Sequence, residues 1–231
     1  MQNIILNWSG GKDATMALHH LSFEEKTNVA SLLTSINSQR KRITMHGVPL
    51  TLLEKQVESL NQKLDLIALP ENISMDKYSQ IVTKKAKEHY RNGITHYAYG
   101  DIFLEDLRLF RDQEAEKAHL QTIYPLWGLN TNDLAQRFIQ LGYKAIVVAV
   151  NSVKLSKEFA GRLYDEEFLK DLPSDVDPCG ENGEFHTFVF DGPLFTLPIK
   201  FNKGKTTLHQ YAPSEDSKSE WDHGVWFCDI S

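Results

Sequence analysis

The sequence has few cysteines, no long apolar run and no excess of cations. Its two cysteines, Cys179 and Cys228, form no CxxC pair, so the pattern predicts neither a zinc knuckle nor a redox dithiol. No apolar stretch approaches the roughly 20 residues that a membrane helix needs, and no membrane partner is expected. Residues 1–8 lack the basic start and apolar core of a signal peptide. Together these absences favour a cytoplasmic protein.

The charge balance is mildly acidic, with 25 lysines and arginines, 31 aspartates and glutamates and a net charge of −6. Because phosphate backbones attract basic surfaces, this total argues against a broad nucleic-acid-binding face. Nucleic acid is therefore not an expected partner, although the total leaves room for a small basic pocket or a local patch. The 231 residues suffice to bury a core in one large domain or two small ones.

The order of the apolar segments predicts the fold class. In residues 1–128, strand-like runs alternate with segments of helical spacing, which predicts an α/β fold: a Rossmann-like parallel sheet with helices on both faces. The expected strands are residues 3–8, 29–36, 64–69, 95–99 and 122–124. The pattern then changes to a helix at 131–141, an apolar strand at 144–150 and short strands after residue 185. We therefore expect a second, smaller α+β domain at 129–231.

A glycine-rich loop, Ser9-Gly10-Gly11-Lys12-Asp13, joins the first strand to the first helix. Its glycines let a phosphate approach the backbone closely, and the helix start supplies unpaired N–H groups. Ser9 adds a hydroxyl donor and Lys12 a charge that suits a leaving pyrophosphate, whereas Asp13 is a candidate helix cap or Mg²⁺ ligand. The loop is not the longer GK[ST] P-loop. It favours ATP binding over a turn that uses glycine for shape alone.

A second polar cluster lies between residues 181 and 187. Glu181 and Glu184 are separated by Gly183 and followed by His186 and Thr187. If the turn directs both carboxylates into one pocket, they can bind Mg²⁺, orient ammonia or an amine, or act as a general base. His186 is the side chain of this cluster that titrates near neutral pH when unperturbed. The alternative for residue types alone is a solvated turn.

Further candidates follow the fourth expected strand. Gly100 and Asp101 lie at a strand end, the edge at which ligands bind to parallel sheets. Arg108 and Arg111 are three residues apart on an expected helix, share a face and suit phosphate contacts; the alternative is a salt-bridged surface helix. Trp127 is expected either to wall the site or to pack at the junction of the domains.

The SGGKD loop resembles that of the PP-loop ATP pyrophosphatases, which adenylate a carbonyl or carboxyl oxygen and release pyrophosphate. Segments 45–48, 100–102, 125–128 and 177–187 make the chain similar to the diphthine–ammonia ligase family within that group. Their forms MHGV, GDI and PCGENGEFHT resemble the bacterial branch, with Asn182 where the archaeal and eukaryotic pattern usually has glycine. Bacteria lack diphthamide, so the resemblance carries the ATP chemistry further than the diphthine substrate.

The resemblance implies an ATP-dependent amide ligase that uses ATP and Mg²⁺, a carboxylate substrate that is a small molecule or protein-borne, and ammonia or an amine. It also implies that the backbone at Thr34 and Ser35 lies along the adenine edge and that His46 lines the pocket. The expected catalytic residues are Lys12, Asp101, Glu181 and Glu184. The expected ATP-binding residues are Ser9, Gly10, Gly11, Lys12, Asp13, Thr34, Ser35, Gly100, Arg108 and Arg111. The expected substrate-binding residues are His46, Trp127, Glu181, Gly183, Glu184, His186 and Thr187.

Two alternatives stay open. One is a PP-loop enzyme that modifies tRNA bases, although thiolation usually requires paired cysteines and the acidic total does not favour tRNA. The other is a non-catalytic sensor of adenine nucleotides, which gives the cluster at 181–187 no purpose. The sequence names neither the carboxylate nor the nitrogen donor, and a homodimer is compatible with it.

Overall fold

A computed structural model describes residues 1–44, 46–71, 73–210 and 224–231. Its first sheet runs in the order β4-β2-β1-β5-β6, and these five strands pair in parallel as predicted. A sixth strand, β3, pairs antiparallel with the end of β2. The strands are β1 (Gln2–Asn7), β2 (Thr27–Asn37), β3 (Arg42–Ile43), β4 (Leu64–Leu69), β5 (His96–Ala98) and β6 (Gln121–Ile123). The sequence pattern missed β3 because two residues carry no periodicity.

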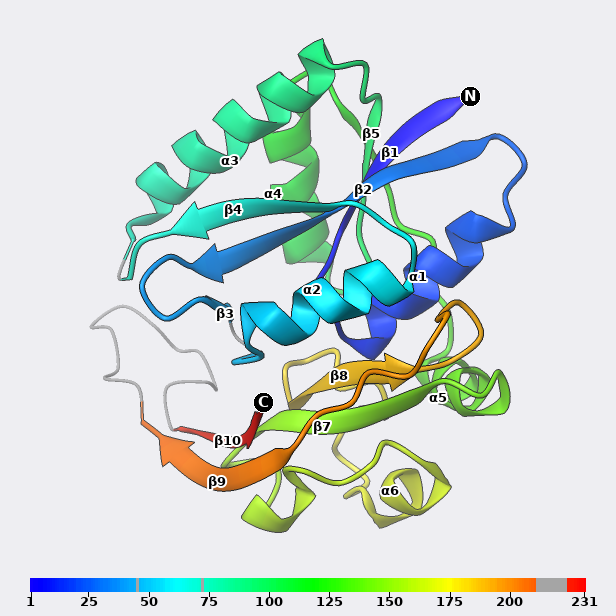
Figure 1. Cartoon of the computed structure of the whole chain (residues 1–231), viewed down its shortest axis with the longest axis vertical. Coiled ribbons are helices and arrows are strands. Elements are labelled where there is room, and N and C mark those ends of the chain that lie inside the picture. Colours follow the sequence, from blue (N-terminus) through cyan, green and yellow to red (C-terminus); the bar gives the residue numbers. More distant parts are fainter. Residues whose placement is uncertain (45, 72, 211–223) are drawn as a thin grey trace.

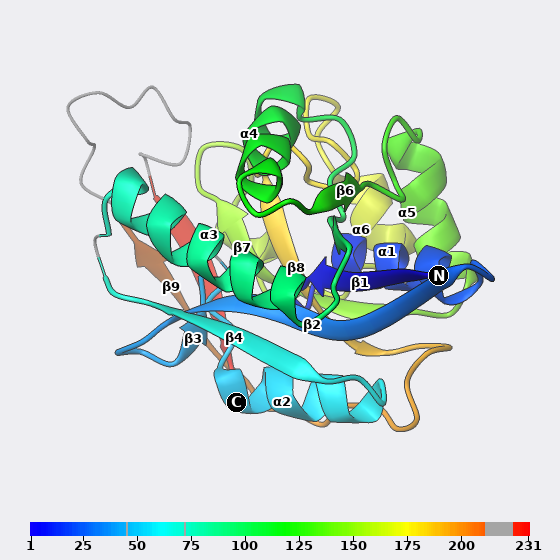
Figure 2. The same ribbon diagram turned by 90° about the horizontal axis from the view of Figure 1, so that it is seen from above.

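Helices cover both faces of this sheet (Figures 1 and 2). The helices α1 (Lys12–Ser22) and α2 (Leu50–Ser59) lie on one face, and α3 (Met75–Arg91) and α4 (Glu105–Glu116) lie on the other. The apolar residues divide accordingly, since Leu18 and Leu52 belong to one buried cluster and Ala86 and Ala115 to another. Ser74 caps α3, with its side chain accepting a hydrogen bond from the Lys77 N–H.

The C-terminal half forms an antiparallel sheet in the order β8-β7-β10-β9. Its strands are β7 (Lys144–Asn151), β8 (Phe185–Asp191), β9 (Lys203–His209) and β10 (Val225–Ile230). Two helices, α5 (Thr131–Gln140) and α6 (Glu166–Asp171), and a short 3-10 turn at Lys157–Phe159 accompany them. β7 is buried from residue 145 to its end, because it lies between two strands and under apolar side chains.

The helices α1 and α2 form a layer between the two sheets (Figure 1). Buried residues of both helices and of β7 and β8 belong to one continuous apolar cluster. This shared core holds the second sheet against the start of α1, where the glycine-rich loop lies. Met45, part of the MHGV segment, lies outside the described residues.

Candidate active site

The glycine-rich loop has the geometry that the sequence predicts. Gly10 has φ +78°, a left-handed conformation that favours glycine. A Cβ on Gly11 would lie 3.2 Å from the Thr187 carbonyl oxygen and 3.3 Å from the His46 ring, so a larger residue there would push these neighbours away. The Ser9 hydroxyl accepts a hydrogen bond from the Gly11 N–H at 3.2 Å. The loop is therefore a narrow backbone turn that approaches the second sheet closely.

Gly100 is required by a similarly close approach. A Cβ at this position would lie 2.8 Å from the backbone carbonyl carbon of Asp13, in the first turn of α1. Because backbone atoms cannot move aside cheaply, only glycine fits. The strand end at Gly100 and the start of α1, directly after the glycine-rich loop, are thus in direct backbone contact, as expected for the carboxyl ends of neighbouring parallel strands.

Strand β8 of the second sheet binds the glycine-rich loop directly. The Val189 N–H donates to the Gly10 carbonyl at 2.9 Å, and the Thr187 hydroxyl accepts from the Lys12 N–H at 3.0 Å. The second contact satisfies one of the unpaired N–H groups at the start of α1. Residues about 180 positions apart in the chain therefore form one structural unit.

Gln56 of α2 joins the same unit, and sequence reasoning missed it. Its amide nitrogen donates to the carbonyls of Gly10 (3.0 Å) and Val189 (2.6 Å), and its amide oxygen accepts from the Trp8 indole at 2.9 Å. The side chain is completely buried. In the sequence, Gln56 looks like the polar residues beside it in α2, Glu54 and Glu58, which are both exposed. Nothing local therefore distinguishes this buried glutamine from a solvated surface residue.

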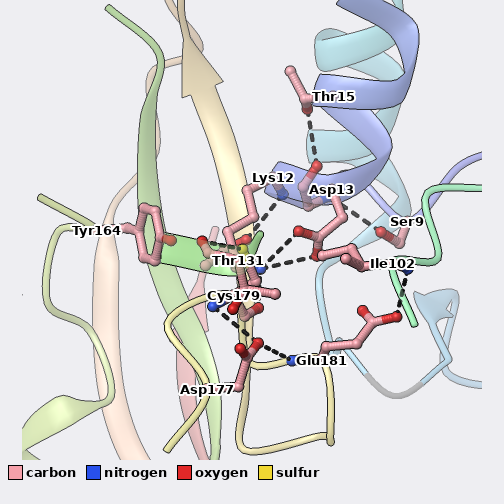
Figure 3. Close-up of polar contacts among 12 residues, drawn as sticks. Ser9, Lys12, Asp13, Thr15, Ile102, Thr131, Tyr164, Asp177, Cys179 and Glu181 are labelled. Atoms are coloured by element: carbon pink, nitrogen blue, oxygen red, sulfur yellow. Dashed lines mark hydrogen bonds and ion pairs between the residues drawn. The ribbon is translucent and has the colours of Figure 1, made fainter. Parts of the chain in front are cut away.

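Lys12 connects the loop to the segment 177–187. Its ammonium group contacts Asp13 at 2.8 Å and donates to the backbone carbonyl of Cys179 (Figure 3). The rings of Tyr164 and Phe185 lie 5.7 and 5.3 Å from this nitrogen. Burial opposes the charged form, but the attraction of Asp13 and weaker contributions leave the pKa of Lys12 raised above its ordinary value. Lys12 is therefore a buried, charged lysine.

Glu181 reaches back across the site to the loop after β5. One carboxylate oxygen accepts from the Ile102 N–H at 2.7 Å and from the Phe103 N–H at 3.4 Å (Figure 3). Burial raises the pKa of Glu181 to about 7 against the opposing hydrogen bond from Ile102, and the carboxylates of Asp13 and Asp101 contribute to the rise. This carboxyl group therefore titrates near neutral pH.

Glu184 has a different set of partners and lies inside its own loop. One of its oxygens accepts from the Asp177 N–H at 3.0 Å and from the Asn182 amide at 3.1 Å. The other oxygen is buried and has no hydrogen-bond partner among the described residues. Gly183, at φ +86°, makes the tight turn that allows this arrangement. The two glutamates that the sequence treated as a pair are thus distinguished by their contacts.

The two arginines of α4 also take separate partners. Arg111 pairs with Asp101 at 2.6 Å and lies over the Tyr99 ring at 4.2 Å. Burial raises the pKa of Asp101, although Arg111 opposes the shift. Arg108 instead lies over the Trp127 ring at 4.5 Å and pairs with Asp112 at 3.8 Å, with its side chain 42% exposed. Arg111 is thus paired with a half-buried carboxylate, whereas the ion pair of Arg108 is longer and open to solvent.

The imidazole rings of His46 and His186 stack, with their centroids 4.4 Å apart. His46 Nδ1 lies 3.4 Å from the Thr187 carbonyl oxygen. Burial lowers the pKa of His46 to about 4 and, together with the nearby charges of His46 and Lys12, also lowers that of His186. An unperturbed imidazole titrates near neutral pH, but burial moves the pKa of His186 well below that range. The group that titrates there is Glu181.

The end of β2 lies beside the glycine-rich loop. The Thr34 hydroxyl is buried and donates to the Trp8 carbonyl at 2.7 Å. The Ser35 carbonyl accepts from the Thr44 N–H at 3.3 Å. Contact of this segment with adenine stays a prediction.

Two family comparisons cover nearly the whole chain. Residues 1–119 match the diphthamide synthase N-terminal domain, and residues 130–231 match the diphthamide synthase C-terminal domain. The chain belongs to the diphthamide synthase family. Within this family, the predicted division of the chain at 128/129 stays a prediction.

Curated relatives of this member of the diphthamide synthase family are named diphthine–ammonia ligase. The protein from Bos taurus is 30% identical over 139 residues, which are 58% of this chain and 51% of the relative. The Homo sapiens protein is 29% identical over the same shares. The Danio rerio protein is 24% identical over 181 residues, 76% of this chain and 70% of the relative. The chain spans about half the length of the mammalian relatives in these matches.

Metal and membrane features are sparse in the part of the chain that the structure describes. No group of three or more His, Cys, Asp or Glu side chains is arranged there to hold a metal ion. Asp13, the candidate Mg²⁺ ligand, already pairs with Lys12. None of the described helices is long and apolar enough to cross a membrane. The expected cytoplasmic location and the homodimer stay predictions.

Proposed function

We propose that this member of the diphthamide synthase family is an ATP-dependent ligase that forms an amide through an acyl-adenylate. The observation that carries the proposal is the position of Lys12. Its backbone belongs to the glycine-rich loop, and its ammonium group contacts the segment that holds Glu181. A phosphate on the loop and a group bound beside Glu181 would therefore share one site.

In the first step, a substrate carboxylate oxygen attacks the α-phosphorus of ATP, and the bond to the bridging oxygen of pyrophosphate breaks. Negative charge develops on the departing pyrophosphate. Lys12, released from the Cys179 carbonyl, and the loop amides would stabilise that charge. Mg²⁺ would neutralise phosphate oxygens when bound, with Asp13 as its candidate protein ligand. Arg108 is the more accessible of the two arginines, since its ion pair with Asp112 is long and exposed at 3.8 Å, whereas Arg111 pairs with the half-buried Asp101 at 2.6 Å.

In the second step, ammonia or an amine attacks the acyl carbon, the bond to AMP breaks and the nitrogen loses a proton. Glu181 suits the role of proton acceptor, because its pKa of about 7 lies near the working pH. Its second oxygen is not engaged by the Ile102 N–H. The names of the relatives specify ammonia as the nitrogen donor, and we propose the same for this chain.

The test is a screen of carboxylates for the ammonium-dependent release of AMP and pyrophosphate. With an ¹⁸O-labelled carboxylate, one labelled oxygen should appear in the AMP, because that oxygen forms the bond to the α-phosphorus. Lys12→Ala should abolish release, and Lys26→Ala, an exposed lysine outside the site, is the matched control. Formation of ADP and phosphate, or unlabelled AMP, would contradict the adenylation step.

A further inference from the structure

A shallow groove of about 460 Å³ lies between α3 and α4. These helices cover the face of the first sheet opposite α1 and α2, so the groove is on the far side from the glycine-rich loop (Figures 1 and 2). Its lining residues are Ser79, Gln80, Thr83, Lys84, Lys87, Arg91 and Lys117. None of them belongs to the candidate active site. The groove is therefore a separate feature.

Three cations of α3 stand in one row along the groove. Lys84, Lys87 and Arg91 follow one another at spacings of three and four residues, which places them on one side of the helix. All three are exposed, and none forms an ion pair among the described residues. Lys85 shows the contrast, since it pairs with Asp65 at 2.8 Å. The charges of the row have no such partner, whereas the charge of Lys85 is balanced by Asp65.

The floor of the groove is a closed polar network. Buried Glu114 of α4 accepts hydrogen bonds from Ser79 at 2.8 Å and Thr83 at 3.0 Å and pairs with Lys117. Despite its burial, these contacts lower the pKa of Glu114, so the carboxylate is ionised and offsets the charge of Lys117. The network ties α3 to α4 and leaves the three positive charges of the row uncompensated.

We propose that this groove binds the phosphodiester backbone of a nucleic acid. Lysine, arginine and glutamine side chains are typical phosphate contacts. Successive cations of the row are offset by about 4.5 and 6 Å along the helix axis, so each can contact a different phosphate. The lining residues include no aromatic ring for base stacking and no large apolar pocket to anchor a peptide helix. Binding is therefore to the backbone and independent of base sequence.

The acidic total of the chain does not conflict with this inference. A net charge of −6 averages over the whole surface, whereas backbone contacts depend on the few cations within a Debye length, about 10 Å at moderate salt. The surrounding acidic surface repels phosphates, so we expect a modest affinity. Three phosphate contacts give a slope of about −2.7 in a plot of log affinity against log salt on a duplex.

The experiment measures fluorescence anisotropy of short labelled RNA and DNA duplexes of the same sequence, titrated with the full chain at several salt concentrations. The test variant is Lys84→Gln/Lys87→Gln/Arg91→Gln. The matched control is Lys26→Gln/Lys55→Gln/Lys63→Gln, which removes the same charge from exposed positions outside the groove. Thermal melts of both variants verify that the fold is kept, since glutamine is a good helix former.

We expect the groove variant to lose at least about tenfold in affinity and its salt slope to change from about −2.7 to about zero, while the affinity of the control stays within about twofold of wild type. Equal binding of RNA and DNA supports backbone recognition, and a preference for RNA supports it with added contacts to the 2′-hydroxyl. The proposal is overturned if wild type shows no salt-dependent binding. It is also overturned if both variants lose affinity equally, or if an acidic peptide binds the groove and neither duplex does.

Discussion

The hydroxyl of Thr187, in the second sheet, accepts a hydrogen bond from the backbone N–H of Lys12, in the first turn of α1, at 3.0 Å. A helix start offers unpaired N–H groups that bind phosphates, and here one of them is fixed by a residue from the other half of the chain. The position of the glycine-rich loop therefore depends on the second sheet.

Thr187→Val should weaken ATP binding about tenfold and lower the free energy of unfolding by about 1 kcal/mol. Valine has the size of threonine but no hydroxyl, so the Lys12 N–H loses its buried acceptor. Isothermal titration with a non-hydrolysable ATP analogue measures the first effect, and urea unfolding the second. Thr187→Ser keeps the hydroxyl and should restore both values. If the serine variant behaves like the valine variant, the hydrogen bond is not the cause.

Gln56→Leu should lower the free energy of unfolding by about 3 kcal/mol. The change leaves the Trp8 N–H and the Val189 carbonyl buried without this partner, and each such group costs about 1–3 kcal/mol. Glu54→Leu, an exposed position on the same helix, is the control and should change stability by less than about 0.5 kcal/mol. Similar losses in both variants would mean that the bridge contributes little.

The rate of amide formation should rise with pH up to about 7 and then level off, because Glu181 with a pKa of about 7 accepts a proton only when ionised. Glu181→Gln should remove this dependence and slow the aminolysis step about a hundredfold. A pH series at a constant concentration of free ammonia, followed by single-turnover kinetics, isolates that step. A pH dependence that persists in the variant would assign the titrating group elsewhere.

The carboxyl group of Glu181 should also affect stability, and here a rise in pH is unfavourable, whereas it raises the rate of amide formation. Its pKa is raised on folding from 4.5 to about 7, so the folded state is destabilised progressively as the pH rises through that interval. Glu181→Gln should therefore be more stable than wild type at pH 8, by about 3 kcal/mol, and equally stable at pH 4. Urea unfolding at the two pH values checks this. A variant that is less stable at pH 8 would contradict the raised pKa.

The two arginines of α4 should respond differently to the same substitution. Arg111→Gln leaves the half-buried Asp101 carboxylate without its cation and should cost about 3 kcal/mol of stability. Arg108→Gln should cost less than about 1 kcal/mol, because its side chain is 42% exposed, but should weaken pyrophosphate binding. Thermal melts with and without pyrophosphate separate the effects. If Arg111→Gln and Arg108→Gln lower the melting temperature equally, the ion pair of Arg111 contributes no more to stability than that of Arg108.

The sequence by itself determined the parallel strands of the first sheet and the turn of the glycine-rich loop. These features depend on short-range chemistry. The spacing of apolar residues predicts the strands, and the positive φ at the turn from β1 to α1 requires a glycine, Gly10. The expected strands of the first sheet all occur, with no end displaced by more than two residues. The grouping of Ser9–Asp13 with Gly100 followed from one rule, that parallel strands end at a common edge.

Only the tertiary structure decided which polar groups are buried and what they contact. Gln56 is a loop anchor because of residues far along the chain, and Glu181 and Glu184 differ because one reaches Ile102 and the other stays inside its own turn. The pKa values of Glu181 and His186 moved in opposite directions for the same reason, since burial penalises the charged form of each. Burial is a property of the assembled chain, and no local pattern carries it.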